Sequence, residues 1–279
     1  MRITIVAIVL TVIVSAGIIG YAVTGLAYAQ TRVGSANKTL NVVISHQNGL
    51  NTTVTDLNSR FNSLSSSATP NPQQISALFA QFAANESAAG VTDDQDASSL
   101  AAAKASLSEQ QWLTIIARNS LDDEAAKLDH ARKAVSIAKT EAAGYAQVGL
   151  FLQTYYGIQT DFELVSTQAA SADLAGANTT LATMKTDVDK GLQLSTAPGL
   201  PSEAYAAMID LGTLVTDYRK LLDSVAANDD TAIINADKSV QADAAKLATY
   251  KIDTIMAEIG AYYAPMFDEI NAEMAKAAS

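Results

Sequence analysis

The chain opens with an almost unbroken hydrophobic run. No residue is charged from Ile3 to Thr31, and as a helix the stretch from Ile3 to Tyr28 would be about 39 Å long at roughly 1.5 Å per residue. A helix of this length can cross a hydrocarbon core of about 30 Å. Residues 1–32 are therefore predicted to be a transmembrane anchor or a signal sequence, with the N-terminus inside and the rest of the chain outside.

Two interpretations of this segment stay open. The apolar core of a signal peptide is usually shorter, about 7–15 residues, which favours a retained anchor. Ala27-Tyr28-Ala29 nevertheless fits the small-residue cleavage pattern. Cleavage after Ala29 would release a secreted or periplasmic protein that begins at Gln30. Under both interpretations residues 33–279 are expected outside, because no second apolar run returns the chain across the membrane.

After the apolar run, hydrophobic positions repeat at alternating steps of three and four, a spacing typical of left-handed helix packing. The predicted coiled-coil seam consists of Leu40, Val43, Gln47, Leu50, Val54, Leu57, Phe61 and Leu64. Gln47 is its only polar member. If the anchor is retained, the membrane helix is expected to continue into this stalk as one rod. The seam either packs on other helices of the same chain or pairs with a second copy in a parallel homodimer.

The rest of the chain also has helical spacing, interrupted by stretches typical of turns such as SSSATPNP, AGVTDDQDASS and STAPGLPSE. The expected helices cover about 73–88, 97–118, 120–169, 173–194, 203–226 and 231–277, the last kinked at Pro265. Asp93, Asp94 and Asp96 are expected in a loop that caps the next helix. The predicted fold class is all-α, an elongated antiparallel helical bundle that follows an N-terminal transmembrane helix.

An internal repeat organises the second half of the chain. Residues 158–177 align with 214–233, which pairs Phe162 with Tyr218 and Asp173 with Asp229. Each copy is expected to contain a helix end, a turn capped by Asp and the start of the next helix. We predict two stacked bundles that share long helices. The membrane-proximal bundle would comprise 33–143 plus 253–279, and the distal bundle would comprise 144–252 with the two helical-hairpin repeats.

Composition narrows the range of functions. The chain has 279 residues and no cysteine, so it can form neither a disulfide nor a thiolate site. Its formal net charge of −11 disfavours nucleic acid as a partner. His46 and His130 have no neighbouring ligand pattern for a metal, and the paired carboxylates stand where helix caps are needed. The sequence has no phosphate loop and no nucleophile elbow. We therefore expect no catalytic residues, no metal and no cofactor, in a protein that is not an enzyme.

Two tyrosine pairs, Tyr155/Tyr156 and Tyr262/Tyr263, remain as candidates for a ligand or partner patch. Adjacent residues of a helix point about 100° apart, so one ring of each pair can enter the core while the other lies at its rim. In architecture the two-bundle layout resembles the sensing domains of bacterial chemoreceptors and sensor kinases, which implies an extracytoplasmic sensory module. The expected cytoplasmic portion, Met1 and Arg2, is too short to signal by itself.

The leading hypothesis is a non-enzymatic, single-pass, membrane-anchored extracytoplasmic protein that acts as a cell-envelope scaffold or interaction partner. Its expected partners are the membrane, through the N-terminal helix, and a second copy or another envelope protein. The alternative is a solute-binding or sensory helical-bundle module that signals through a partner membrane protein.

Overall fold

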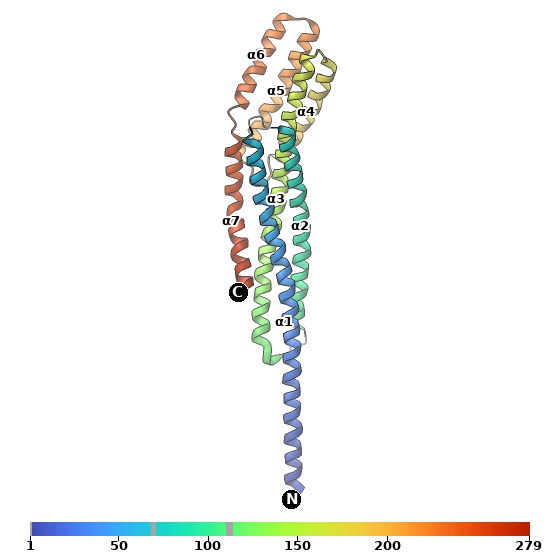
Figure 1. The fold of residues 1–279 in the computed structure, drawn as a ribbon, viewed down its shortest axis with the longest axis vertical. Coiled ribbons are helices and arrows are strands. Elements are labelled where there is room, and N and C mark those ends of the chain that lie inside the picture. Colours follow the sequence, from blue (N-terminus) through green and yellow to red (C-terminus); the bar gives the residue numbers. More distant parts are fainter. Residues whose placement is uncertain (1, 68–70, 110–113) are drawn as a thin grey trace. The chain divides into compact units, whose positions relative to one another are not determined.

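A computed structural model of the chain describes residues 2–67, 71–109 and 114–279, with side chains described at all of these positions except 2–20, 50, 51 and 116. Over these ranges the fold is all-α, as predicted, with seven α-helices and one short 3₁₀ helix (Figure 1). They are α1 (Arg2–Ser65), α2 (Pro72–Ser108), η1 (Ile115–Ala117), α3 (Arg118–Ala170), α4 (Leu174–Leu194), α5 (Ser202–Ala227), α6 (Asp230–Leu247) and α7 (Ile252–Ala278).

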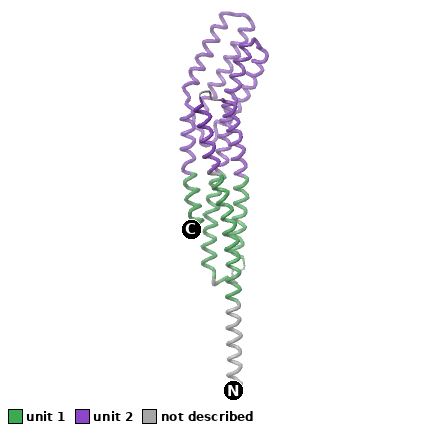
Figure 2. The backbone as a smooth tube through the Cα atoms, in the orientation of Figure 1, with its two compact units in different colours: residues 1–49, 91–139, 266–279 green, residues 50–90, 140–265 purple. Residues whose placement is uncertain are grey.

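The chain divides into two compact units, and α1, α2, α3 and α7 each contribute residues to both (Figure 2). Unit 1 comprises residues 1–49, 91–139 and 266–279, and unit 2 comprises 50–90 and 140–265. The predicted membrane-proximal bundle included residues 50–90, which in the structure group with 140–265 instead.

Unit 1 has a core of small and aliphatic side chains. Small residues let helix backbones approach closely, so that a few leucines can fill the space between them. The main hydrophobic cluster contains Ala29, Ala36, Leu40 and Val43 from α1, Leu100 and Leu107 from α2, Ala117 from η1, Leu121, Leu128, Ala131 and Val135 from α3, and Ala277 from α7. In a second, smaller cluster Ile270 of α7 packs against Ala134 and Ala138 of α3.

Unit 2 has a core rich in aromatic rings. Phe61 of α1, Phe79 of α2 and Tyr156 of α3 contact one another, with ring centroids 5.5 to 6.4 Å apart. Tyr145 of α3 stacks on Tyr263 of α7 at 4.1 Å. Rings at these separations add attraction beyond the area they bury.

The two turns of the predicted repeat, both in unit 2, have matching backbone geometry. Ala172 and Asn228 are left-handed, with φ of 62° and 53°. The next residues, Asp173 and Asp229, cap α4 and α6, because each carboxylate accepts a hydrogen bond from the backbone N–H three residues later, at 2.9 and 3.0 Å. Each α-helical hairpin therefore reverses direction in the same way.

The structure corrects the predicted break between residues 89 and 96, because α2 continues through it as one helix. Its acidic residues do not form a loop. Asp93 and Asp96 are buried against α1, and Asp94 forms an ion pair with Lys139 of α3 at 2.6 Å. Partners on other helices stabilise these polar residues inside a helix, and sequence spacing alone cannot reveal such partners.

The last predicted helix, 231–277, is also wrong, since it is divided into α6 and α7 by a turn at 248–251. This turn contains neither Gly nor Pro. Tyr250 and Lys246 both bond to Asp210 of α5, at 2.7 Å each, which fixes the end of α6. The break is therefore set by a contact with another helix. Pro265 lies within α7.

The N-terminal segment and the stalk share one helical backbone, since α1 runs from Arg2 to Ser65. The predicted anchor, residues 1–32, falls largely on residues 1–20, which lie outside the residues whose side chains are described. Among the residues that the structure describes in full, no helix has an apolar stretch long enough to span a membrane.

Candidate functional site

Most of the predicted seam residues whose side chains are described are buried within their own chain. Leu40, Val43 and Gln47 are buried in unit 1, whereas Leu57 and Phe61 are buried in unit 2. The remaining members are Val54 and Leu64, which are half-buried, and Leu50, which lies outside the residues with described side chains. Helices of the same chain therefore cover most of the described positions of this seam.

The two tyrosine pairs each place one ring in the core of unit 2 and the other nearer its surface. Tyr263 is 1% exposed and Tyr262 is 46% exposed. Tyr156 is buried and Tyr155 is half-buried. The pairs contribute to two aromatic groups, since Tyr156 packs on Phe61 and Phe79 whereas Tyr263 packs on Tyr145.

Tyr263 is enclosed by two glycines and a loop. A Cβ at Gly144 would lie within 2.1 Å of the Tyr263 hydroxyl, and a Cβ at Gly199, whose φ is +86°, would lie within 2.7 Å of its ring. The hydroxyl donates a hydrogen bond to the carbonyl of Pro198 at 2.8 Å. Burial and nearby negative charge raise the pKa of Tyr263, so it stays neutral. The ring of Tyr263 is therefore packed tightly within the core of unit 2.

A buried polar layer crosses unit 1 between α1 and α2. Gln47 Nε2 donates to Asp93 Oδ1 at 2.7 Å, and His46 Nδ1 lies 3.0 Å from Asp96 Oδ2. Asp93 is 0% exposed, and its Oδ2 has no hydrogen-bond partner among the described residues. Burial raises the pKa of Asp93 to about 6, and the hydrogen bond from Gln47 only partly offsets this. The polar Gln47 in an apolar seam was the sequence signal for this layer.

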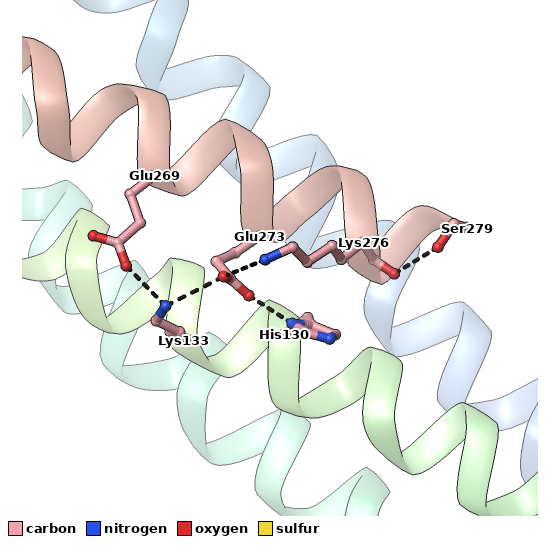
Figure 3. A network of polar contacts seen from close by, with 6 residues as sticks. All are labelled: His130, Lys133, Glu269, Glu273, Lys276 and Ser279. Carbon is pink, nitrogen blue, oxygen red and sulfur yellow. Dashed lines mark hydrogen bonds and ion pairs between the residues drawn. The ribbon is translucent and has the colours of Figure 1, made fainter.

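A second polar network ties α7 to α3 in unit 1 (Figure 3). The buried carboxylate of Glu273 contacts His130 Nδ1 at 2.5 Å, Lys133 Nζ at 3.2 Å and Lys276 Nζ at 2.9 Å. These donors lower the pKa of Glu273 to about 2. Lys133 also reaches Glu269 at 2.8 Å. All these residues are on two helices, so the network fastens the end of α7 to α3.

A comparable polar contact joins α5 and α6 in unit 2. Asp210 of α5 accepts hydrogen bonds from Lys246 and Tyr250, which lower its pKa despite its burial. This contact holds α6, whose only buried residue is Val240. The three polar groups therefore join neighbouring helices, and the buried carboxylates of Asp210 and Glu273 are each paired with a lysine.

The chemistry available at these groups is limited. His46 and His130 each contact a carboxylate through Nδ1, an arrangement that orients an imidazole, but the two lie in different contact groups. Over the ranges that the structure describes, no three His, Asp or Glu side chains gather as a metal site requires. We assign these groups to helix pairing, and no described group of side chains points to a reaction.

One further cluster lies where α1 enters unit 1. The Arg32 guanidinium stacks on the Tyr28 ring at 4.2 Å from its centroid, and the same arginine bonds to the Tyr28 hydroxyl. It also forms an ion pair with Glu109, just after α2, at 2.9 Å. Nearby Ala29 is 2% exposed within the core of unit 1. Residues on both sides of the predicted cleavage site therefore take part in the folded unit.

Comparisons with known proteins return no matching family model, no similar curated protein and no similar solved structure.

Proposed function

We propose that the chain is a non-enzymatic, membrane-anchored protein whose helical domain lies outside the membrane and acts as an envelope scaffold or interaction partner. The observation that carries this proposal is the continuity of α1 from Arg2 to Ser65, because the apolar segment and the folded units share one helix with no linker. Such a helix would position the domain relative to the bilayer and not merely tether it.

The contacts around Ala29 favour retention of the segment over its cleavage. Removal of residues 1–29 would take Ala29 out of the core of unit 1 and would break the contacts between Tyr28 and Arg32. A signal peptide does not ordinarily contribute to the mature core, since it is removed. The folded unit uses residues that cleavage would discard.

The length of the remaining apolar segment also suits an anchor. Gly25 is the first buried position described on α1, which leaves Ile3 to Thr24 outside the described core. These 22 residues would extend about 33 Å as a helix, close to the roughly 30 Å thickness of a hydrocarbon core. The segment is therefore as long as an anchor needs to be.

The anchor is tested by the intact mass of the protein in carbonate-washed membranes and in the soluble fraction. We expect the full-length mass in the membranes. The matched variant is Ala27→Leu, which removes the cleavage pattern at an exposed position. It should behave as the wild type does. A soluble wild-type protein beginning at Gln30, absent from the variant, would contradict the anchor.

The scaffold role is tested separately by crosslinking in the same membranes. We expect reproducible crosslinks to a second copy or to one other membrane or envelope protein. A strictly monomeric protein with no reproducible crosslinked product would contradict this role and leave the anchor untouched.

A solute-binding module is the second candidate, and one groove of unit 2 favours it. The groove lies between α4 and α5, has a volume of about 400 Å³, and combines apolar Val188 and Met208 with charged Lys185, Asp189 and Lys220. A thermal-shift screen with amino acids, organic acids and amines tests this candidate, since a ligand raises the midpoint by mass action. A flat response across the screen would count against it.

A further inference from the structure

In one section of the α1–α2 pair of unit 1, every buried side chain is polar. Over residues 45–49 of α1 the only buried side chain is Gln47, and over residues 91–96 of α2 the only buried side chains are Asp93 and Asp96. Apolar contacts give most of the stability of a helix pair. The contact between α1 and α2 in this section therefore depends on hydrogen bonds and on the charges of its members.

Asp93 is the least satisfied member of this polar layer. Gln47 donates one hydrogen bond to its Oδ1, whereas its Oδ2 is buried without a hydrogen-bond partner among the described residues. Asp210 and Glu273 are buried too, but each pairs with a lysine, and Asp93 has no such pair among the described residues. A buried carboxylate without a compensating cation is costly, and the neutral acid costs much less.

The charged groups that face Asp93 do not compensate it. Asp94 and Asp96 of α2 repel a negative charge on Asp93, and His46 of α1 attracts one. His46 is engaged with Asp96 at 3.0 Å, and Lys139 of α3 is engaged with Asp94 at 2.6 Å. Burial has the largest effect, and the pKa of Asp93 is raised to about 6.

Each of the two helices also has a glycine close to the layer. Gly49 follows Gln47 by two residues, and Gly90 precedes Asp93 by three. A Cβ at either position would meet nothing within 4 Å, so close packing does not require glycine there. Glycine is the least favourable helix residue after proline. Both helices are therefore weakened beside the section in which their contact is polar.

We propose that this layer is a pH switch: it holds the turns at 45–49 and 91–96 closed while Asp93 carries its proton, and it lets them open and hydrate when Asp93 gives that proton to water. Local opening of a few turns within an otherwise folded unit is a common mode of motion. The switch goes beyond the proposed scaffold function and does not depend on the anchor, since all its residues follow the predicted cleavage site.

The working range of the switch follows from the two states of Asp93. In the open state the carboxyl is hydrated and its pKa is near the ordinary 3.8, whereas in the closed state it is about 6. The closed state is therefore favoured most below pH 4, and it loses this advantage as the pH rises from 4 to 6. A histidine gains positive charge as the pH falls, so the contact between His46 and Asp96 strengthens in the same direction.

Amide hydrogen exchange of the full-length protein in detergent tests the switch at pH 4.5 and pH 7. Exchange rates are corrected for the intrinsic effect of pH. We expect protection in peptides from 40–49 and 91–100 to fall at least about fivefold from pH 4.5 to pH 7 in the wild type. In Asp93→Asn, which does not titrate and keeps an oxygen for Gln47, the change should stay below about twofold.

Asp94→Asn is the matched control, because Asp94 is adjacent and exposed, and it should keep the wild-type dependence on pH. Gly90→Ala should raise protection at both pH values by the same factor, since it strengthens the helix without changing the titration. Equal protection of the wild type at the two pH values, or an unchanged dependence on pH in Asp93→Asn, would overturn the proposal.

Infrared spectroscopy of the wild type gives a second test, which holds even if Asp93→Asn fails to fold. We expect the band of a protonated carboxyl to disappear with a midpoint near pH 6, well above the range of ordinary aspartates. The absence of any carboxyl that titrates between pH 5 and pH 7 would overturn the proposal.

Discussion

Unit 1 and unit 2 are both built from long helices, but the side chains between those helices differ. In unit 1, buried Asp93, Asp96 and Glu273 bond to partners on neighbouring helices, and the surrounding core is Ala, Leu and Val. In unit 2, rings such as Phe79, Tyr156 and Tyr263 fill the interior. Every buried aromatic side chain that the structure describes belongs to unit 2.

This difference assigns different properties to the two units. Hydrogen bonds and ion pairs depend on direction and on protonation, so the polar layer of unit 1 specifies helix register and responds to pH. Each aromatic ring buries more apolar area than a smaller side chain does, and its packing does not depend on pH in the neutral range. We therefore expect substitutions in unit 2 to have the larger effects on stability and those in unit 1 to have the larger dependence on pH.

The largest effect is expected from Tyr263→Ala in unit 2. It removes a fully buried ring, its stacking on Tyr145 and its hydrogen bond to Pro198, and should lower the free energy of unfolding by about 3–5 kcal/mol. The matched control is Tyr262→Ala, because Tyr262 is adjacent but exposed, and its cost should stay below about 1 kcal/mol. Urea unfolding, with amide hydrogen exchange of unit 2 peptides, measures both. Equal losses would refute the core role of Tyr263.

The next effect is expected from Asp93→Asn in unit 1, and it should be stabilising above neutral pH. The pKa of Asp93 is about 6 in the folded chain and near 3.8 in an unfolded one, so the folded state holds the proton more tightly. The contribution of Asp93 to stability is therefore greatest below pH 4 and declines as the pH rises through 6, by about 2–3 kcal/mol. Asparagine keeps an oxygen for Gln47 and does not titrate.

Urea unfolding at pH 4.5 and pH 8 tests this prediction. The advantage of Asp93→Asn over the wild type should be larger at pH 8 than at pH 4.5. Asp94→Asn is the control, because Asp94 is exposed and loses only a surface ion pair with Lys139. An Asp93→Asn variant that is less stable than the wild type at pH 8 would show that the Asp93 charge is better compensated than its unpartnered Oδ2 indicates.

A smaller effect with the opposite pH dependence is expected from Glu273→Gln. The pKa of Glu273 is lowered to about 2, so its contribution is present above pH 4.5 and is lost as the pH falls toward 2. The variant should melt several degrees below the wild type at pH 7, and amide exchange should rise in residues 266–279. Glu269→Gln is the control, as Glu269 is half exposed. An equal drop in melting temperature for Glu273→Gln and Glu269→Gln would mean that the burial of Glu273 adds nothing to its contribution to stability.

The smallest effect is expected at the helix caps of unit 2. Asp173→Ala and Asp229→Ala each remove one bond to a backbone N–H and should each cost about 1 kcal/mol. Because the two turns share their geometry, the two costs should agree within about 0.5 kcal/mol. Thermal unfolding of the single and double variants measures this. Strongly unequal costs would show that the surrounding packing, and not the cap, dominates at one turn.

Much of the helical layout could be predicted because its signals are local. The helix that begins after Asp173 and the helix that ends at Asn228 were placed within a residue or two, since caps and left-handed turns depend on neighbouring residues. The aligned Phe162 and Tyr218 of the repeat also contact each other, with ring centroids 5.4 Å apart. The predicted helix boundaries were wrong at Asp93 to Asp96 and at Tyr250. At both places, contacts with other helices decided the backbone conformation, and local composition did not.

The sequence by itself determined the all-α class, the apolar N-terminal segment, the stalk periodicity and the two Asp-capped turns, because these depend on residues within a few positions of one another. Only the tertiary structure decided that Asp93 belongs to a helix and pairs with Gln47, and that Glu273 fastens α7 to α3. It alone showed that Ile115 of η1 is exposed. Such contacts join residues 46 to 143 positions apart, a separation over which no local pattern carries information.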